Sequence, residues 1–176
     1  MSATNRSNVR HPDDFYRTPK WCTELLMDYL SLPKEARILD IAAGDGAILD
    51  VFKEKGHHTY GIEINEQRCV DANENHIMEL GDYLETSRFE KYVVVTNPPY
   101  KLAMEFMSKA VKENEIVCSL LRLPWLASSK RKEWLKKNTP TVAVLSKRPS
   151  FTGNGTDATD YAWMIWNGES PKVVIL

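Results

Sequence analysis

The sequence predicts a doubly wound α/β fold, in which helices cover both faces of a mostly parallel sheet of seven strands. Short apolar runs alternate with segments whose apolar residues have helical spacing, from residue 21 to residue 166. No internal repeat or low-complexity segment interrupts this alternation. Glycines and polar residues follow several of the apolar runs, and a sheet of this kind binds ligands at the carboxyl ends of its strands.

The first half of the chain should follow a polar, flexible arm over residues 1–14. The helix predicted over 21–30 carries its apolar residues on one face, and Pro33 ends it. The helix over 47–55 is closed by Gly56 at its C-terminal cap. A further helix extends to residue 70, and the expected strands are 37–42, 59–64, 76–80 and 91–96.

The second half continues the same alternation. Residues 102–111 predict a helix, and residues 125–137 predict a basic helix. The Gly- and Thr-rich link over 152–160 should be a loop. The expected strands are 115–123, 142–146 and 161–166, and the sequence does not decide whether 173–176 adds an edge strand.

Composition limits the class of protein. At 176 residues with 43% hydrophobic content, the chain fits a single domain, which we expect over residues 15–176. Its apolar stretches fall short of the roughly 18 residues that cross a bilayer, and the polar start lacks the apolar core of a signal peptide. We expect a cytoplasmic protein without a membrane partner. The three cysteines and four histidines lack metal-ligand spacing, so no metal site is predicted.

The most informative motif is Asn97-Pro98-Pro99-Tyr100, which follows the apolar run 92–96. Its two prolines end the strand and remove two backbone donors, so nearby carbonyls stay free to accept hydrogen bonds. The Asn97 side-chain oxygen and the Pro98 carbonyl can hold both hydrogens of an exocyclic amine, while Tyr100 offers the ring a flat surface. The motif predicts an enzyme that acts on an amino group; a proline turn beside a core tyrosine is the alternative.

Polar groups follow the other strands of the first half as well. The first strand leads into the turn 40–46, Asp-Ile-Ala-Ala-Gly-Asp-Gly, where glycines allow a close backbone approach. Glu63 lies about 20 positions later, the usual place for a carboxylate that binds ribose hydroxyls. Gly81-Asp82 follows the third strand. Each carboxylate, taken alone, is also typical of an ordinary capping or surface residue. Four strand ends that all carry polar residues, however, predict a single ligand-binding site.

Together these residues resemble class I methyltransferases that use S-adenosylmethionine, specifically the amino-methyltransferases of the DNA adenine type. The resemblance covers residues 15–166, with the cofactor motifs before Asn-Pro-Pro-Tyr as in the gamma arrangement. It implies the Rossmann-like methyltransferase fold and methyl transfer from S-adenosylmethionine to the exocyclic amino group of adenine in DNA. Two features depart from the family: Ile41-Ala42 replaces the common Pro-Phe, and no target-recognition domain is evident. We therefore expect a short recognition sequence or no sequence selectivity, unless a partner or oligomer supplies the selectivity.

The resemblance also implies a role for each motif. The turn 40–46 wraps the methionine part of the cofactor, Glu63 binds the ribose, and Ile64 and Asp82 contact the adenine. The motif over 15–19 closes over the methionine end. The implied catalytic residues are Asn97, Pro98, Pro99 and Tyr100. The implied cofactor-binding residues are Phe15, Tyr16, Thr18, Pro19, Asp40, Ala42, Gly44, Gly46, Glu63, Ile64, Asp82, Tyr83 and Asn97.

A flipped adenine would stack on Tyr100, and Phe151 matches the family position of a second aromatic that helps to sandwich it. The net charge is only −1, but residues 128–148 carry seven Lys and Arg against one Glu. We expect Lys130, Arg131 and Arg148 to contact phosphates; a solvated helix face is the alternative.

Other functions remain open for the same motif. Related enzymes methylate adenine in RNA or a glutamine side-chain amide in proteins, although the glutamine enzymes usually carry an added N-terminal helical domain. DNA is favoured over RNA as the substrate. A different class is a catalytically silent, nucleic-acid-binding partner subunit, which the intact Asn97 motif, glycine turn and Glu63 disfavour.

Overall fold

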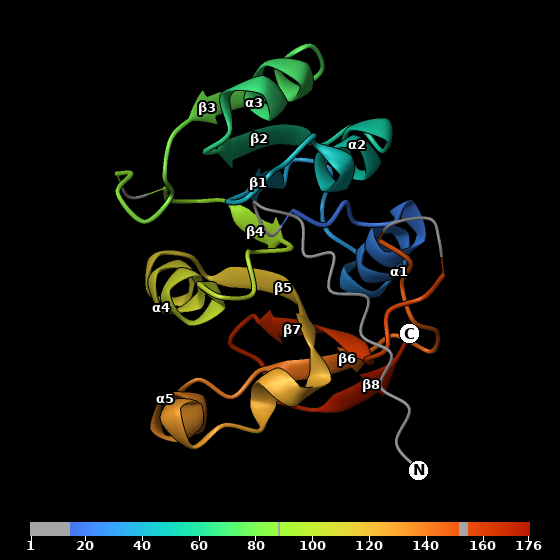
Figure 1. Ribbon diagram of the computed structural model, residues 1–176, viewed down its shortest axis with the longest axis vertical. Helices are drawn as coiled ribbons and strands as arrows, with labels where there is room; N and C mark the ends of the chain where they lie inside the picture. Colours follow the sequence, from blue (N-terminus) through green and yellow to red (C-terminus); the bar gives the residue numbers. More distant parts are fainter. Residues whose placement is uncertain (1–14, 88, 152–154) are drawn as a thin grey trace.

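The computed structural model describes residues 15–87, 89–151 and 155–176. One eight-stranded sheet runs through the molecule in the order β3-β2-β1-β4-β5-β7-β6-β8 (Figure 1). Only β7 runs antiparallel to its neighbours, β5 and β6. The strands are β1 (Arg37–Asp40), β2 (His58–Glu63), β3 (Ile77–Leu80), β4 (Val93–Thr96), β5 (Ile116–Arg122), β6 (Thr141–Val144), β7 (Tyr161–Trp166) and β8 (Val173–Ile175).

Helices cover both faces of this sheet, which confirms the doubly wound prediction. α1 and α2 lie on one side, and α4 and α5 lie on the other (Figure 1). Each side has its own buried apolar cluster, with Leu26 and Phe52 in the first and Phe106 and Met107 in the second. The helices are α1 (Lys20–Leu30), α2 (Ala47–Glu54), α3 (Glu66–Asn73), α4 (Ala103–Glu113) and α5 (Lys132–Lys137), with 3₁₀ turns η1 (Leu123–Leu126) and η2 (Ser129–Arg131).

The sheet has one strand more than the predicted seven. The last residues of the chain form β8, which pairs in parallel with β6. Val173 and Ile175 are 71% and 68% exposed, whereas Val174 and Leu176 pack against the core, so this apolar run is an edge strand with one face buried. α1 also ends differently from the prediction. Ser31 takes a left-handed conformation with φ 48° and closes the helix before Pro33 is reached.

The basic helix predicted over 125–137 is wrong in its first half, where the chain forms η1 and η2 before α5 begins. Trp125 and Trp134 both pack edge-on against Trp166, with ring centroids 6.5 and 5.9 Å away. Nine residues of continuous α-helix would place these two side chains about 180° apart. The chain therefore has to break between them, and Ser128 is extended there, with φ −148° and ψ 126°.

The parallel strands bring the predicted site residues to one edge of the sheet. β1, β2 and β4 end at Asp40, Glu63 and Thr96, and strand order reverses between β1 and β4, so their carboxyl ends flank the switch point. The predicted arm over 1–14 and part of the predicted loop, 152–154, lie outside the described residues. Within the described part of the chain, no helix is long and apolar enough to cross a membrane.

Candidate active site

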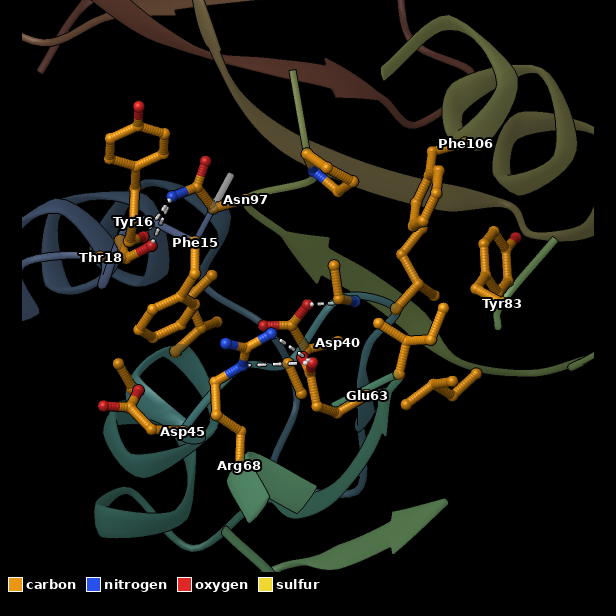
Figure 2. A pocket seen from close by; sticks show the side chains of 18 of the residues that line it. Phe15, Tyr16, Thr18, Asp40, Asp45, Glu63, Arg68, Tyr83, Asn97 and Phe106 are labelled. Carbon is orange, nitrogen blue, oxygen red and sulfur yellow. Dashed lines mark hydrogen bonds and ion pairs between the residues drawn. The ribbon is translucent and has the colours of Figure 1, made fainter. Parts of the chain in front are cut away.

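A cavity of about 780 Å³, counting its open mouth, lies at this edge of the sheet. Its lining includes the apolar side chains of Ile62, Leu102 and Phe106. Figure 2 shows Phe106 on one side of the cavity and the carboxylates of Asp40 and Asp45 on the other. The cavity is lined by ten of the thirteen residues predicted to bind a cofactor: Phe15, Tyr16, Thr18, Asp40, Ala42, Glu63, Ile64, Asp82, Tyr83 and Asn97.

The other three predicted residues, Pro19, Gly44 and Gly46, do not line the cavity but shape its border. Gly44 and Gly46 have φ angles of 55° and 83°, which side chains rarely adopt. A Cβ on Gly44 would lie 2.3 Å from Cε2 of Phe15. Glycine at this position therefore allows both the turn and the close packing of the Phe15 ring on it.

Asp40 is the most deeply buried carboxylate of the cavity, with 1% of its surface exposed. Its Oδ1 accepts a hydrogen bond from the Ala42 N–H at 3.1 Å. The pKa of Asp40 is raised to about 7, chiefly by burial and to a smaller extent by the nearby carboxylates of Glu63 and Asp45, whereas the hydrogen bond from Ala42 opposes the rise. We therefore expect a cation bound in the cavity to favour the charged form of the Asp40 carboxylate.

Glu63, the last residue of β2, accepts hydrogen bonds from three segments: the glycine turn, the start of the loop after β2, and α3. Its Oε2 accepts the Gly44 N–H at 2.8 Å, and its Oε1 accepts the Asn65 N–H at 2.8 Å. The Arg68 guanidinium donates to the same Oε1 at 3.1 and 3.2 Å (Figure 2) and lies 4.7 Å from the centre of the Phe15 ring. Glu63 therefore fixes the glycine turn, and Arg68 covers both Glu63 and Phe15.

The Asn97 loop has the acceptors that the motif predicts. The Asn97 Nδ2 donates to the Tyr16 carbonyl at 3.0 Å and to the Thr18 Oγ1 at 3.1 Å (Figure 2). The Pro99 carbonyl accepts the Leu102 N–H, whereas the buried Pro98 carbonyl accepts no hydrogen bond from the described residues. Asn97 and Pro99 line the cavity, whereas Pro98 and Tyr100 do not.

Aromatic rings gather beside Asn97, and of these Tyr16 lines the cavity whereas Tyr100, Phe151 and Tyr161 do not. Tyr16 stacks on Tyr100 with centroids 5.7 Å apart and an interplanar angle of 23°. The edge contact between Tyr16 and Phe151 spans 5.8 Å, and Tyr161 touches both Tyr100 and Phe151. Burial raises the pKa of Tyr100 well above its usual value, so its ring stays neutral. Tyr100 and Phe151 thus lie in one aromatic cluster and Tyr16 contacts both rings, while their stacking on a substrate base stays a prediction.

The cations predicted to contact substrate lie elsewhere. Lys130, Arg131 and Arg148 are absent from the lining of the cavity. The Arg131 Nε donates to the Trp125 carbonyl at 2.8 Å, and its guanidinium lies 4.9 Å from the Trp125 ring centre. Arg148 pairs with Asp160 at 2.7 Å. Two of the three cations thus have protein partners, and their phosphate contacts stay a prediction.

Sequence reasoning missed two arginines that belong to this region. Arg68 follows Glu63 by five positions, so its pairing had a local signal. Arg122 lies 4.7 Å from the Tyr100 ring centre and donates to Tyr161 and Asp157 at 2.9 and 3.3 Å. It is the last residue of β5, so the strand-end rule that selected Asp40 and Glu63 would also have found it.

Comparisons with known proteins agree on the fold. No protein-family model matches the chain, and no curated protein matches its sequence. Similar solved structures include a candidate RNA methyltransferase from Pyrococcus horikoshii, with TM-score 0.67, 19% identity and coverage of 85% of this chain and 83% of that one. An RNA methyltransferase from Salinibacter ruber, in complex with S-adenosyl-L-homocysteine, has TM-score 0.60, 15% identity and coverage of 88% and 95%.

A third similar structure is the type I restriction-modification methyltransferase subunit from Streptococcus thermophilus, with TM-score 0.67 and 16% identity. The match covers 88% of this chain but only 45% of that subunit, so this chain spans less than half of that protein. At these identities the likeness concerns the fold, which the chain shares with these methyltransferases.

Proposed function

We propose that this protein is an S-adenosylmethionine-dependent methyltransferase that acts on the exocyclic amino group of adenine in DNA. The observation that carries the proposal is the position of the Asn97 loop. It joins a cavity with a buried carboxylate on one side to a cluster of aromatic rings on the other. A cofactor would occupy the cavity, and the substrate base would approach the Asn97 loop from the side of the aromatic cluster.

The cavity fits the cofactor in charge and shape. Asp45 pairs with Arg17 through Oδ2 at 2.6 Å, whereas its buried Oδ1 has no hydrogen-bond partner among the described residues. Together with Asp40 and Glu63, it suits a ligand that carries positive charge and hydroxyl groups. Ile62, Ile64 and Phe106 offer an apolar wall to a flat ring. The Salinibacter ruber structure of the same fold contains S-adenosyl-L-homocysteine.

When bound, S-adenosylmethionine supplies an electrophilic methyl group on sulfur. The residues of the protein bind the cofactor and the base, orient the two reacting groups and stabilise the charge that develops between them. Asn97 Oδ1 and the Pro98 carbonyl accept the two amine hydrogens, which aims the nitrogen lone pair and stabilises the positive charge that grows on nitrogen. The substrate base would stack against the aromatic cluster of Tyr16, Tyr100 and Phe151, and such stacking offsets the cost of unstacking the base, at about 1 to 3 kcal/mol per base.

RNA is the second candidate substrate. Two of the three similar structures named above bear the names of RNA methyltransferases. A partner that supplies sequence selectivity also fits the proposal, because the cations expected to contact phosphates lie outside the cavity.

The test is incubation of the purified protein with methyl-labelled cofactor and matched DNA, RNA and glutamine-peptide substrates, followed by mass analysis of digested products. We expect N6-methyldeoxyadenosine. Asn97→Ala should lower turnover by about 10²-fold while its affinity for S-adenosyl-L-homocysteine, measured by calorimetry, stays within twofold of wild type.

Asn75→Ala, an exposed asparagine between α3 and β3, is the control and should behave as wild type. Near-normal turnover of Asn97→Ala would contradict the role of Asn97. Methylated adenosine in RNA alone would move the substrate to the second candidate, and cofactor binding without transfer to any substrate would favour the silent partner subunit.

A further inference from the structure

The Asn97 amide can adopt only one of its two orientations. A backbone carbonyl accepts hydrogen bonds and never donates them. Because the Tyr16 carbonyl lies 3.0 Å from the end of the amide, that end has to be the Nδ2 group. A flipped amide would place Oδ1 against the carbonyl oxygen. The Thr18 Oγ1, at 3.1 Å, takes the second hydrogen of the same nitrogen.

This orientation turns Asn97 Oδ1 away from residues 16–18 (Figure 2). The hydrogen bonds of the described residues include no donor to this oxygen, so its lone pairs are available to a ligand. Thr18 is only 3% exposed. Water is therefore a poor substitute for its hydroxyl, and loss of that hydroxyl would leave one Nδ2 hydrogen without an acceptor.

The segment that supplies both acceptors is itself held firmly. Arg17 pairs with Asp45 at 2.6 Å, and Tyr16 stacks on Tyr100. The Pro19 carbonyl accepts the Cys22 N–H at 3.0 Å, which joins the segment to the first turn of α1. The two acceptors are thus fixed relative to the Asn97 loop from both ends.

We propose that Thr18 is a positioning residue, whose hydroxyl, together with the Tyr16 carbonyl, holds the Asn97 amide so that Oδ1 faces the acceptor amine. The inference rests on the proposed amino-methyl transfer. It assigns Thr18 a second task beside the cofactor contact that the sequence predicts. A purely structural Thr18 would contribute only its buried methyl group to packing.

The test compares Thr18→Val, which keeps the shape and removes the hydroxyl, with Thr18→Ser, which restores it. Thr23→Val is the matched control, because Thr23 is a buried threonine of α1 whose Oγ1 has no partner among the described residues. We expect Thr18→Val to lower kcat about 3- to 10-fold, the usual effect of one neutral hydrogen bond, with KM for nucleic acid and cofactor affinity within twofold. Thr18→Ser should recover most of the loss, and Thr23→Val should not change kcat.

A double-mutant cycle separates positioning from packing. In the Asn97→Ala background, Thr18→Val should have no further effect on residual turnover. An equal loss in both backgrounds, or wild-type kcat for Thr18→Val, would overturn the proposal.

A second readout does not depend on activity. The side-chain amide protons of Asn97, assigned by comparison with Asn97→Ala in ¹⁵N NMR spectra, should exchange with solvent faster in Thr18→Val than in wild type. Unchanged exchange would refute the hydrogen bond. A wild-type protein that methylates no substrate would refute the proposed function instead, while leaving this measurement valid.

Discussion

Replacement of Asp40 by Asn should stabilise the fold at alkaline pH. The carboxylate is 1% exposed, and burial raises its pKa from 3.8 to about 7. The folded chain therefore keeps this proton up to about pH 7, whereas the unfolded chain releases it near 3.8. Stability falls with rising pH wherever the folded state binds more protons. Asn keeps the size of Asp and the acceptor for the Ala42 N–H but removes the ionisation.

The size of the effect follows from this pKa difference. Between pH 5 and pH 8, the cost of ionising Asp40 in the folded state grows by about 2 to 3 kcal/mol. For a chain of this length, each kcal/mol corresponds to about 2 to 4 °C in Tm. The Tm of Asp40→Asn, minus that of wild type, should thus increase by about 5 to 10 °C over this pH range.

The assay is thermal unfolding followed by circular dichroism at pH 5, 6, 7 and 8 without cofactor. Groups other than Asp40 titrate in both proteins and cancel in the difference. Asp28→Asn, a change at an exposed carboxylate of α1, is the control, and its Tm difference should not grow with pH. A difference for Asp40→Asn that stays constant from pH 5 to 8 would refute the proposed burial effect.

Three further predictions concern the cavity. Affinity for the cationic cofactor should rise about tenfold from pH 6 to pH 8 as Asp40 ionises, and calorimetry should show this rise in wild type and a clearly smaller one in Asp40→Asn. Glu63→Gln should weaken cofactor binding at least about tenfold, because Gln cannot accept from Gly44, Asn65 and Arg68 together; unchanged affinity would remove Glu63 from the site. Gly44→Ala should lower the free energy of unfolding by about 1 to 3 kcal/mol, because its Cβ would overlap the Phe15 ring; an unchanged urea midpoint would contradict that packing.

The fold class and most of the cavity can be predicted from the amino-acid sequence alone. Alternating apolar runs predict a parallel sheet, and the carboxyl ends of parallel strands share one edge. Asp40, Glu63, Asp82 and Asn97 could therefore be placed together from their positions at or just after the ends of predicted strands. These signals are local, since each depends on a strand and the few residues that follow it. The predicted phosphate contacts had no such signal, because a run of positive charge does not say which side chains find protein partners.

The contacts between segments that are distant in the sequence follow from the tertiary structure and not from local sequence patterns. Thr18 and Asn97 are 79 positions apart, and no periodicity indicates that the hydroxyl of one orients the amide of the other. The packing of Trp125 and Trp134 on Trp166 breaks the predicted basic helix, and pairing with β6 turns the last residues into β8. In each case the free energy comes from contacts between residues that are far apart in the chain, whereas sequence patterns report which residues share a face of one element.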